Sequence, residues 1–283
     1  MQIAVLCSRV RVEEKLLFGA LRERDVEFDT IDVRRLALDV ARNDFTQYDA
    51  VLIRCLSHSR AFYLSRWLKG LGVRTVNRHE PIAVCGDKLL TSFALQEAGL
   101  PIPRTEFAFD SDAMIEAVEA TGYPVVFKPL HGSWGRLLAK ANDRCAVEAL
   151  LEHKKTLGGY AHAIFYAQEY VSKPGRDIRA LVVGDDVIYA VWRSSDHWIT
   201  NTATGGETAP CPLTDEIRDL SLRAALAVGG DVVAVDLLET GDGRILVNEV
   251  NHTPEFHGAL EVTNVDIAGR MIDFVLQVAE ERV

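Results

Sequence analysis

Two strongly apolar segments near the end of the chain predict an antiparallel hairpin. They cover residues 232–238 and 244–250, and Gly241-Asp242-Gly243 between them is a turn sequence. Val, Leu and Ile fill most of their positions, as expected for strands packed in a core. The few polar residues on this hairpin therefore need an explanation.

Three polar residues of the hairpin form a candidate metal site: Asp236, Glu249 and Asn251. Side chains alternate between the faces of a strand, so Glu249 and Asn251 share a face, and Asp236 joins them if the strands pair. Oxygen ligands of this kind suit Mg²⁺, which keeps positions for phosphate oxygens and water. Taken alone, the trio more often describes the polar outer face of a hairpin, but its apolar neighbours favour a site.

A lysine at the end of an apolar strand forms a candidate phosphate-binding element. Lys128 ends the segment 124–128, and a turn with two glycines follows it. An ammonium group beside backbone N–H groups can hold phosphate, although the Walker A pattern is absent and an ordinary turn is the alternative. The candidate turn residues are Gly132, Ser133, Trp134 and Gly135.

A second lysine, Lys88, begins a predicted helix over residues 87–98 that stops at Gly99. A cation is unfavourable at a helix N-terminus unless an anion lies nearby, which nucleotide phosphate would supply. A solvated surface lysine is the alternative.

Weaker signals lie between these elements. Residues 168–171 end a strand that could offer backbone groups to an adenine, and Asp177 could hold ribose hydroxyls. Residues 198–206 form a polar, glycine-containing stretch typical of a binding loop. His252 and His257 beside the hairpin are interpreted as contacts to substrate or to the ligands rather than as metal ligands.

The remaining pattern predicts α/β architecture. The first 70 residues alternate strand and helix, which indicates a small parallel sheet, and no GxGxxG turn marks a dinucleotide site. Antiparallel hairpins and helices follow. Predicted helices begin with Ser111 as N-cap, after Asp143 and after Asp266, and a further helix covers residues 215–228. Predicted strands cover residues 178–183 and 187–192.

The composition of the chain indicates which partners it does not bind and in which cell compartment it works. The net charge of -10 argues against nucleic acid and against an anionic membrane surface. Five scattered cysteines without a CxxC pair indicate reduced thiols, and no apolar run approaches a membrane span or a secretory signal. We expect a cytoplasmic protein.

Taken together, and in their order along the chain, the motifs resemble the ATP-grasp superfamily. Within it they resemble the branch that includes the ligase adding glutamate to ribosomal protein S6. The closest resemblance is to the α-aminoadipate–LysW ligases of amino-group-carrier lysine biosynthesis. It is carried by Cys85-Gly-Asp-Lys88, Gly132-Ser-Trp-Gly-Arg136, His197-Trp-Ile-Thr-Asn-Thr202 and Asn248-Glu-Val-Asn-His-Thr253. Many ATP-grasp loops have only small residues after the lysine, whereas this one has Trp134 and Arg136.

The resemblance implies roles for individual residues. Lys88, Lys128 and the glycine-rich turn would contact the nucleotide phosphates, and Asp177 the ribose. Arg193 and Asn201 would face the γ-phosphate and the acyl centre as catalytic residues. The adenine hinge would be Glu169, Tyr170 and Val171, and the ligands of two Mg²⁺ ions, or of Mn²⁺, would be Asp236, Glu249 and Asn251.

The resemblance also implies a fold and a reaction. An N-terminal α/β lobe (residues 1–83) would precede two ATP-grasp lobes (84–172 and 173–283) that clasp ATP. The enzyme would join α-aminoadipate to the C-terminal glutamate of the acidic carrier LysW, as a homodimer or homotetramer. A basic patch of Lys173, Arg176 and Arg179 would receive the carrier. The alternatives are a glutamate ligase for the same carrier or for a ribosomal-protein tail, and a non-catalytic ATP sensor.

Overall fold

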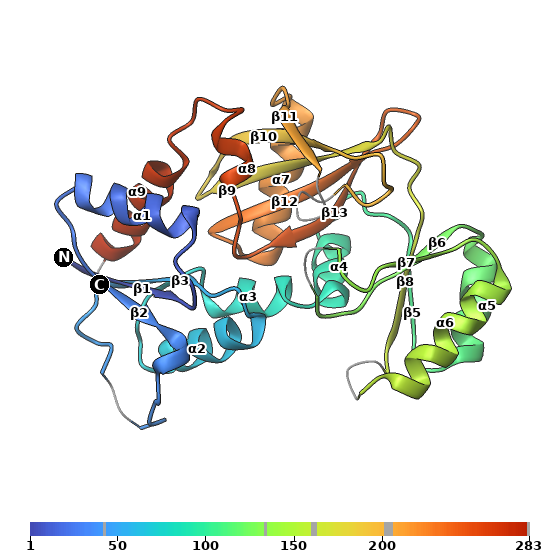
Figure 1. Cartoon of the computed structure of the whole chain (residues 1–283), viewed down its shortest axis with the longest axis horizontal. Helices are drawn as coiled ribbons and strands as arrows, with labels where there is room; N and C mark the ends of the chain where they lie inside the picture. The colour runs from blue at the N-terminus through green and yellow to red at the C-terminus, as the bar shows by residue number, and fades with distance from the viewer. Residues whose placement is uncertain (42–43, 133–134, 160–162, 201–205, 282–283) are drawn as a thin grey trace.

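The computed structural model describes the chain except for residues 42–43, 133–134, 160–162, 201–205 and 282–283. Its strands form three sheets that follow one another along the sequence (Figure 1). Within the described residues, no helix is long and apolar enough to cross a lipid bilayer.

The N-terminal sheet is parallel, as the alternation of strand and helix predicts. Its elements are β1 (Gln2–Cys7), α1 (Val12–Glu23), β2 (Glu27–Asp32), η1 (Val33–Arg35), β3 (Ala50–Arg54), α2 (His58–Gly70), β4 (Thr75–Val76) and α3 (His79–Cys85). The strand order is β2-β1-β3-β4. The central strands β1 and β3 are almost wholly buried, which explains their continuous apolar sequences. Parallel strands share a carboxyl edge, so β1 and β3 present their following loops on the same side.

The middle sheet is antiparallel, in the order β5-β8-β6-β7. Its elements are α4 (Lys88–Glu97), β5 (Thr105–Ala108), α5 (Ser111–Thr121), β6 (Val125–Phe127), β7 (Ala139–Ala141), α6 (Arg144–Leu157) and β8 (Phe165–Glu169). Helices α5 and α6 lie together beside this sheet (Figure 1) and share an apolar core with it. Helix α4 is tied to the sheet by a 2.9 Å hydrogen bond between Ser92 and the Tyr166 hydroxyl. The backbone N–H of Lys88 donates to the carbonyl of Leu130 over 3.0 Å, which places the start of α4 beside the segment that follows β6.

The C-terminal sheet is antiparallel and has the order β11-β10-β9-β12-β13. Its elements are β9 (Arg176–Val183), β10 (Asp186–Ser194), β11 (Glu207–Pro210), α7 (Asp215–Val228), β12 (Val232–Glu239), β13 (Ile245–Asn251), α8 (His257–Leu260) and α9 (Ile267–Glu280). Strands β12 and β13 form the predicted hairpin. Apolar side chains of α7 pack against the strands, including Val233 and Val235. The polar residues of the hairpin therefore occupy the face away from α7.

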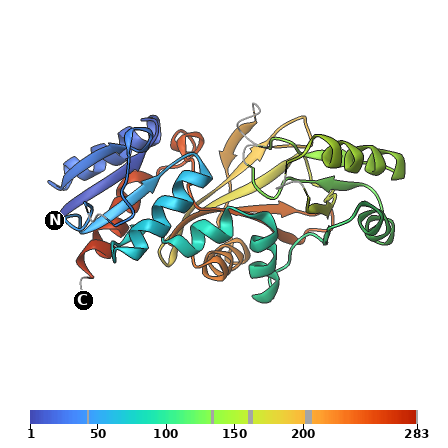
Figure 2. The ribbon, with the colours of Figure 1, turned by 90° about the horizontal axis from the view of Figure 1, so that it is seen from below.

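The last helix, α9, packs against the N-terminal lobe. Helix α9 packs beside α1 (Figures 1 and 2), and Met271 shares a core with Leu17 of α1 and Leu181 of β9. The N-terminal sheet and the C-terminal sheet therefore share one apolar core.

Most predicted helix boundaries are confirmed. Asp87 caps α4 by accepting hydrogen bonds from the N–H groups of its first turn, and Gly99 follows the helix with a φ of +65°. Asp266 caps α9 as predicted. The predicted N-cap at Ser111 is wrong by one residue, since Asp110 is the cap. Aspartate and serine are nearly equivalent caps, so two adjacent candidates leave the boundary open.

Candidate active site

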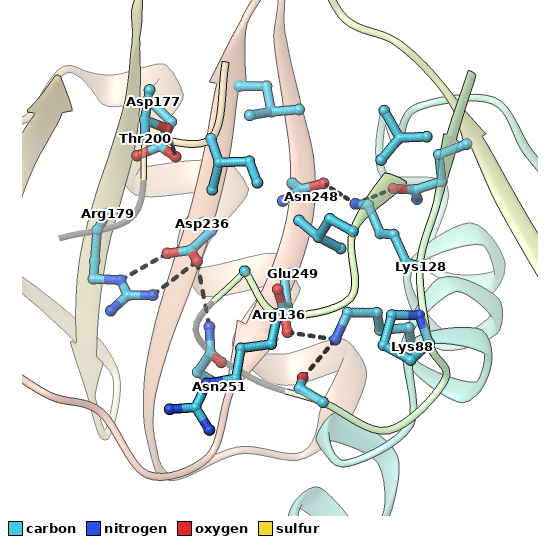
Figure 3. A pocket seen from close by; sticks show the side chains of 18 of the residues that line it. Lys88, Lys128, Arg136, Asp177, Arg179, Thr200, Asp236, Asn248, Glu249 and Asn251 are labelled. Atoms are coloured by element: carbon cyan, nitrogen blue, oxygen red, sulfur yellow. Dashed lines mark hydrogen bonds and ion pairs between the residues drawn. The ribbon is translucent and has the colours of Figure 1, made fainter. Parts of the chain in front are cut away.

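The predicted pairing of the hairpin is confirmed, and it gathers the three candidate metal ligands. Asp236 lies opposite Glu249, and Ala234 lies opposite Asn251. After Asp236 the register shifts, so that Leu237 pairs with Val247 and Asn248 is an extra residue in β13. Figure 3 shows the three candidate side chains on one side of the hairpin, and all three line the same cavity.

Asp236 is buried and held by two arginines. Arg179 donates hydrogen bonds of 2.8 Å to both of its carboxylate oxygens, and Arg193 lies 3.3 Å from one of them. The amide of Asn251 donates to the same carboxylate over 3.4 Å. Burial alone would raise the pKa of Asp236, but the two guanidinium groups lower it to about 2. The carboxylate is therefore ionised at neutral pH.

The two candidate phosphate lysines approach the hairpin from different elements. Lys88 donates to Glu249 over 3.1 Å and to the carbonyl of Gly132 over 2.9 Å. Lys128 donates to Asn248 over 3.0 Å and to the side chain of Gln168. These contacts bring the middle and C-terminal sheets together at one cavity (Figure 3).

The buried position of Lys128 changes its acidity. Its side chain is almost fully buried, and burial lowers its pKa to about 8, with Lys88 and Lys173 adding to the effect and Glu249 opposing it. A cation in this position is costly without an anion. The cavity is thus prepared for a negatively charged ligand near Lys128.

The glycine-rich turn lines the cavity where the structure describes it. Gly135 has a φ of +66°, and a Cβ added there would lie 2.9 Å from Cγ2 of Ile199. Glycine is therefore required for both backbone conformation and space. Gly132 and Arg136 line the cavity as well, whereas Ser133 and Trp134 lie outside the described residues.

The predicted hinge residues Glu169, Tyr170 and Val171 also line the cavity. The Glu169 carboxylate accepts a 2.9 Å hydrogen bond from the backbone N–H of Arg104, and the N–H of Tyr170 donates to a neighbouring carbonyl. The ammonium group of Lys140 lies 3.7 Å from the centre of the Tyr170 ring. These contacts fix the backbone of the segment along one wall of the cavity.

Asp177 and Arg193 form a buried pair beside Asp236. Arg193 donates from Nε to Asp177 over 2.6 Å, and the Thr200 hydroxyl donates to the other oxygen of that carboxylate. Nη1 of Arg193 is buried and has no hydrogen-bond partner among the described residues. This unused donor is available to an anionic ligand. Asn201, which follows Thr200, lies outside the described residues.

Three histidines from three parts of the chain lie close together, and two of them, His58 and His252, line the cavity. His58 begins α2, His131 lies in the turn after Lys128, and His252 follows β13. The His58 ring lies 5.8 Å from the His131 ring and 5.7 Å from the His252 ring. Burial and the neighbouring His58 lower the pKa of His252 to about 4, so it is neutral at pH 7. His257, by contrast, points away to a 2.7 Å contact with Glu13.

The structure does not support the basic patch predicted from Lys173, Arg176 and Arg179. Arg179 lies inside the cavity on Asp236, and Lys173 lines the cavity beside Thr200. Arg176 instead stacks on Trp192 at 4.1 Å and pairs with Glu239. Residues three apart on a strand face opposite sides, which is the signal that separates Arg176 from Arg179.

The cavity also contains three residues that were not predicted for it: Arg179, which was assigned to the carrier patch, Asn248 and His58. Arg179 could have been found, because it lies two residues after Asp177 on the same strand face. Asn248 could not, because its orientation depends on the β-bulge. His58 comes from the N-terminal sheet, and only the tertiary structure brings it to the cavity.

Comparison with known structures identifies the fold. The RimK domain ATP-grasp protein of Sphaerobacter thermophilus superposes with a TM-score of 0.80 and 29% identity, covering 98% of this chain and 100% of that chain. The ATP-grasp ligase PsnB, in a complex with a minimal precursor, Mg and ADP, has the same fold with a TM-score of 0.73 at 22% identity, covering 99% and 98% of the two chains. The protein thus has an ATP-grasp fold, with the parallel lobe placed before two antiparallel lobes.

Sequence comparison identifies the family. Residues 3–84 match the LysX preATP-grasp domain, and residues 85–275 match the RimK-like ATP-grasp domain. The chain belongs to the RimK-like ATP-grasp family, and it is an ATP-dependent carboxylate–amine ligase. The glutamate–LysW ligase ArgX of Sulfolobus acidocaldarius is 35% identical over 277 residues (97% of this chain, 98% of the relative). The α-aminoadipate–LysW ligase LysX of Saccharolobus solfataricus is 35% identical over 275 residues (96% and 98%).

Proposed function

We propose that this ligase joins the amino group of α-aminoadipate to the side-chain carboxylate of the C-terminal glutamate of LysW. The observation that carries the proposal is the single cavity in which Lys88 and Lys128 face Asp236 and Glu249. It combines phosphate-binding cations with oxygen ligands, and the LysW ligases are similar to this chain over nearly its whole length.

In this proposal the nucleotide lies between the two ATP-grasp lobes, residues 84–172 and 173–283. The adenine rests against the segment from Glu169 to Val171, and the phosphates extend toward Lys128 and Lys88. Burial makes the Lys128 ammonium group costly until an anion approaches, which favours binding of the charged ligand. Asp177 is engaged by Arg193, so its proposed contact with ribose would be made while it also orients that arginine.

The proposed metal ligands are Asp236, Glu249 and Asn251. Among the described residues, no three His, Cys, Asp or Glu side chains converge on one point, and this set has two carboxylates and one amide. Such a set fits a Mg²⁺ ion that takes its remaining ligands from phosphate and water. When bound, the ion neutralises charge on the phosphate oxygens. Asp236 is held in its ionised form by Arg179 for this role.

The reaction would proceed in two steps. The glutamate carboxylate of the carrier attacks the γ-phosphorus of ATP, the bond to the bridging oxygen breaks, and an acyl phosphate and ADP form. The amine of the second substrate then attacks the acyl carbon, and phosphate leaves as the amide forms and a proton is lost. The protein supplies positioning and positive charge rather than a nucleophile. Arg193, whose buried Nη1 has no partner among the described residues, would stabilise charge on the transferring group.

Glutamate is the second candidate for the amine donor. ArgX, a glutamate–LysW ligase, and LysX, an α-aminoadipate–LysW ligase, are each 35% identical to this chain. The two donors differ by one methylene group, which an apolar contact discriminates by only about 1–3 kcal/mol. The residues that choose between them must therefore lie close to the donor side chain.

One assay tests the proposal. Release of ADP is measured with ATP, Mg²⁺ and purified LysW, using α-aminoadipate, glutamate or lysine as the donor, and the carrier mass is measured afterwards. We expect ADP formation with a carrier heavier by one residue of α-aminoadipate. Turnover with glutamate alone supports the second candidate. ATP binding without ADP formation in any combination contradicts both and supports a sensor.

A further inference from the structure

The loop of residues 252–257, which follows the β12–β13 hairpin, is held by contacts from the N-terminal lobe. His252, Thr253 and Glu255 of this loop line the cavity. His58 and residues 55–56, which follow β3, line the same cavity, and the His58 ring lies 5.7 Å from the His252 ring. If the adenine of ATP lies against residues 169–171, the γ-phosphate lies near the proposed metal ligands Asp236, Glu249 and Asn251. The amine donor would then occupy the part of the cavity beside residues 252–255.

A buried arginine connects this loop to the N-terminal sheet. Arg54, the last residue of β3, is 2% exposed. It donates to Glu14 of α1 over 3.1 Å and to the backbone carbonyl of Pro254 over 3.0 Å. Glu14 is itself fully buried. The guanidinium group thus reaches from the N-terminal sheet to the loop.

Further contacts extend this link along the loop. Arg11 contacts the same Glu14 carboxylate at 2.9 Å and Glu255 at 2.5 Å. The side chain of Asn77 donates to the carbonyl of His252 over 2.7 Å. The loop is therefore fixed at its start, middle and end by residues that precede the ATP-grasp lobes in sequence.

The energetics of Arg54 indicate a positioning role. Burial opposes the charged form and lowers the pKa of Arg54, while Glu14 opposes this effect. A buried ion pair contributes little net stability compared with apolar residues of similar size, but it fixes geometry because its hydrogen bonds are directional. An apolar side chain could fill the space, yet it could not hold the Pro254 carbonyl.

We propose that Arg54 is a positioning residue that sets the conformation of residues 252–257 and thereby the binding of the amine donor. The proposal rests on the proposed ligase function for its substrate. It assigns donor affinity and donor choice to a contact made from the N-terminal lobe, not only to residues that touch the donor.

The test compares Arg54→Met with Arg78→Met. Arg78 also links the N-terminal part of the chain to the C-terminal lobe, through Asp231 and the carbonyl of Gly229, but it lies away from the cavity. We expect Arg54→Met to raise the KM for the amine donor by about tenfold or more and to alter the ratio of kcat/KM for α-aminoadipate and glutamate. The Kd for ATP should stay within about twofold of the wild-type value in both variants, as the nucleotide contacts are untouched. Arg54→Lys, which retains a donor, should recover part of the donor affinity.

Hydrogen exchange gives a readout that does not require turnover. Peptides covering residues 252–260 should exchange faster in Arg54→Met than in Arg78→Met. If Arg54→Met does not fold, Arg11→Met breaks the same network at a less buried residue. Unchanged donor KM, unchanged selectivity and unchanged exchange in a folded variant would overturn the proposal. A wild-type enzyme that uses neither donor contradicts the proposed function instead, and the exchange experiment then still decides the role of Arg54.

Discussion

Arg179 and Asp236 lie directly opposite each other on β9 and β12, and two hydrogen bonds of 2.8 Å join the guanidinium to the carboxylate. Both side chains line the active-site cavity; Asp236 is buried and Arg179 is partly buried. The guanidinium donors of Arg179 and the carboxylate acceptors of Asp236 thus form hydrogen bonds with each other without a bound ligand. A cation at Asp236 would share a carboxylate that is already ionised and fixed in orientation, so little reorganisation is needed when Mg-ATP binds.

Arg179→Met should therefore impair catalysis rather than carrier docking. Loss of the bidentate pair frees the orientation of Asp236, and we expect kcat to fall by about 100-fold. The KM for LysW should change little. Arg176→Met is the matched control, because Arg176 stacks on Trp192 outside the cavity and its loss should leave kcat nearly unchanged. A selective rise in the carrier KM of Arg179→Met would instead support the basic patch.

Asp236→Asn and Glu249→Gln should differ in their effect on the free energy of unfolding but share an effect on the Mg²⁺ requirement. Removing the Asp236 charge leaves Arg179 and Arg193 buried without their shared anion, so we expect a loss of about 3–5 kcal/mol in unfolding free energy. Glu249→Gln should cost no more than about 1 kcal/mol, since the Glu249–Lys88 pair is partly exposed. Both variants should raise the Mg²⁺ concentration needed for half-maximal ADP release. Denaturant unfolding and Mg²⁺ titration measure the two effects, and an unchanged Mg²⁺ requirement would exclude these residues as ligands.

Lys128 should make nucleotide binding depend on pH. Its pKa is about 8 in the free protein, and nearby phosphate should raise it by favouring the charged form. Below pH 8 the lysine is charged before and after binding, so affinity is constant. Above pH 8 binding takes up a proton, and affinity should fall by up to about tenfold per pH unit. Calorimetry at pH 8.5 in buffers of different ionisation enthalpy measures this proton. The proton should be missing in Lys128→Met, and equal uptake by both proteins would exclude Lys128 as its source.

Gly135→Ala should weaken nucleotide binding through the backbone. The left-handed φ of +66° costs a non-glycine residue about 1 kcal/mol, and the new Cβ would meet Ile199 at 2.9 Å. We expect the Kd for ATP to rise by about tenfold. Gly241→Ala is the control, because Gly241 lies in the β12–β13 turn and has no atom within 4 Å of an added Cβ. Equal Kd values for the two variants would show that the turn does not shape the site.

The sequence by itself determined the elements and much of the chemistry. Two apolar segments and the glycine turn between them predicted the β12–β13 hairpin, and its register confirmed that Asp236 lies opposite Glu249. The predicted helix over residues 87–98 corresponds to α4, and the ordered motifs predicted the ATP-grasp fold. The hairpin and the helix are local features, because each depends on residues close together in the sequence.

The partners of the buried charged groups depend on the folded chain. The contacts Arg179–Asp236, Lys128–Asn248 and Arg54–Pro254 join residues that are 57, 120 and 200 positions apart. A sequence pattern gives the face of a strand, but not which distant side chain will share a buried cavity with it. Burial then fixes the partners, because a charge removed from water must find a counterion or a polar acceptor within hydrogen-bond distance. That requirement pairs Arg179 with Asp236 in the cavity and joins Arg54 to the loop of residues 252–257.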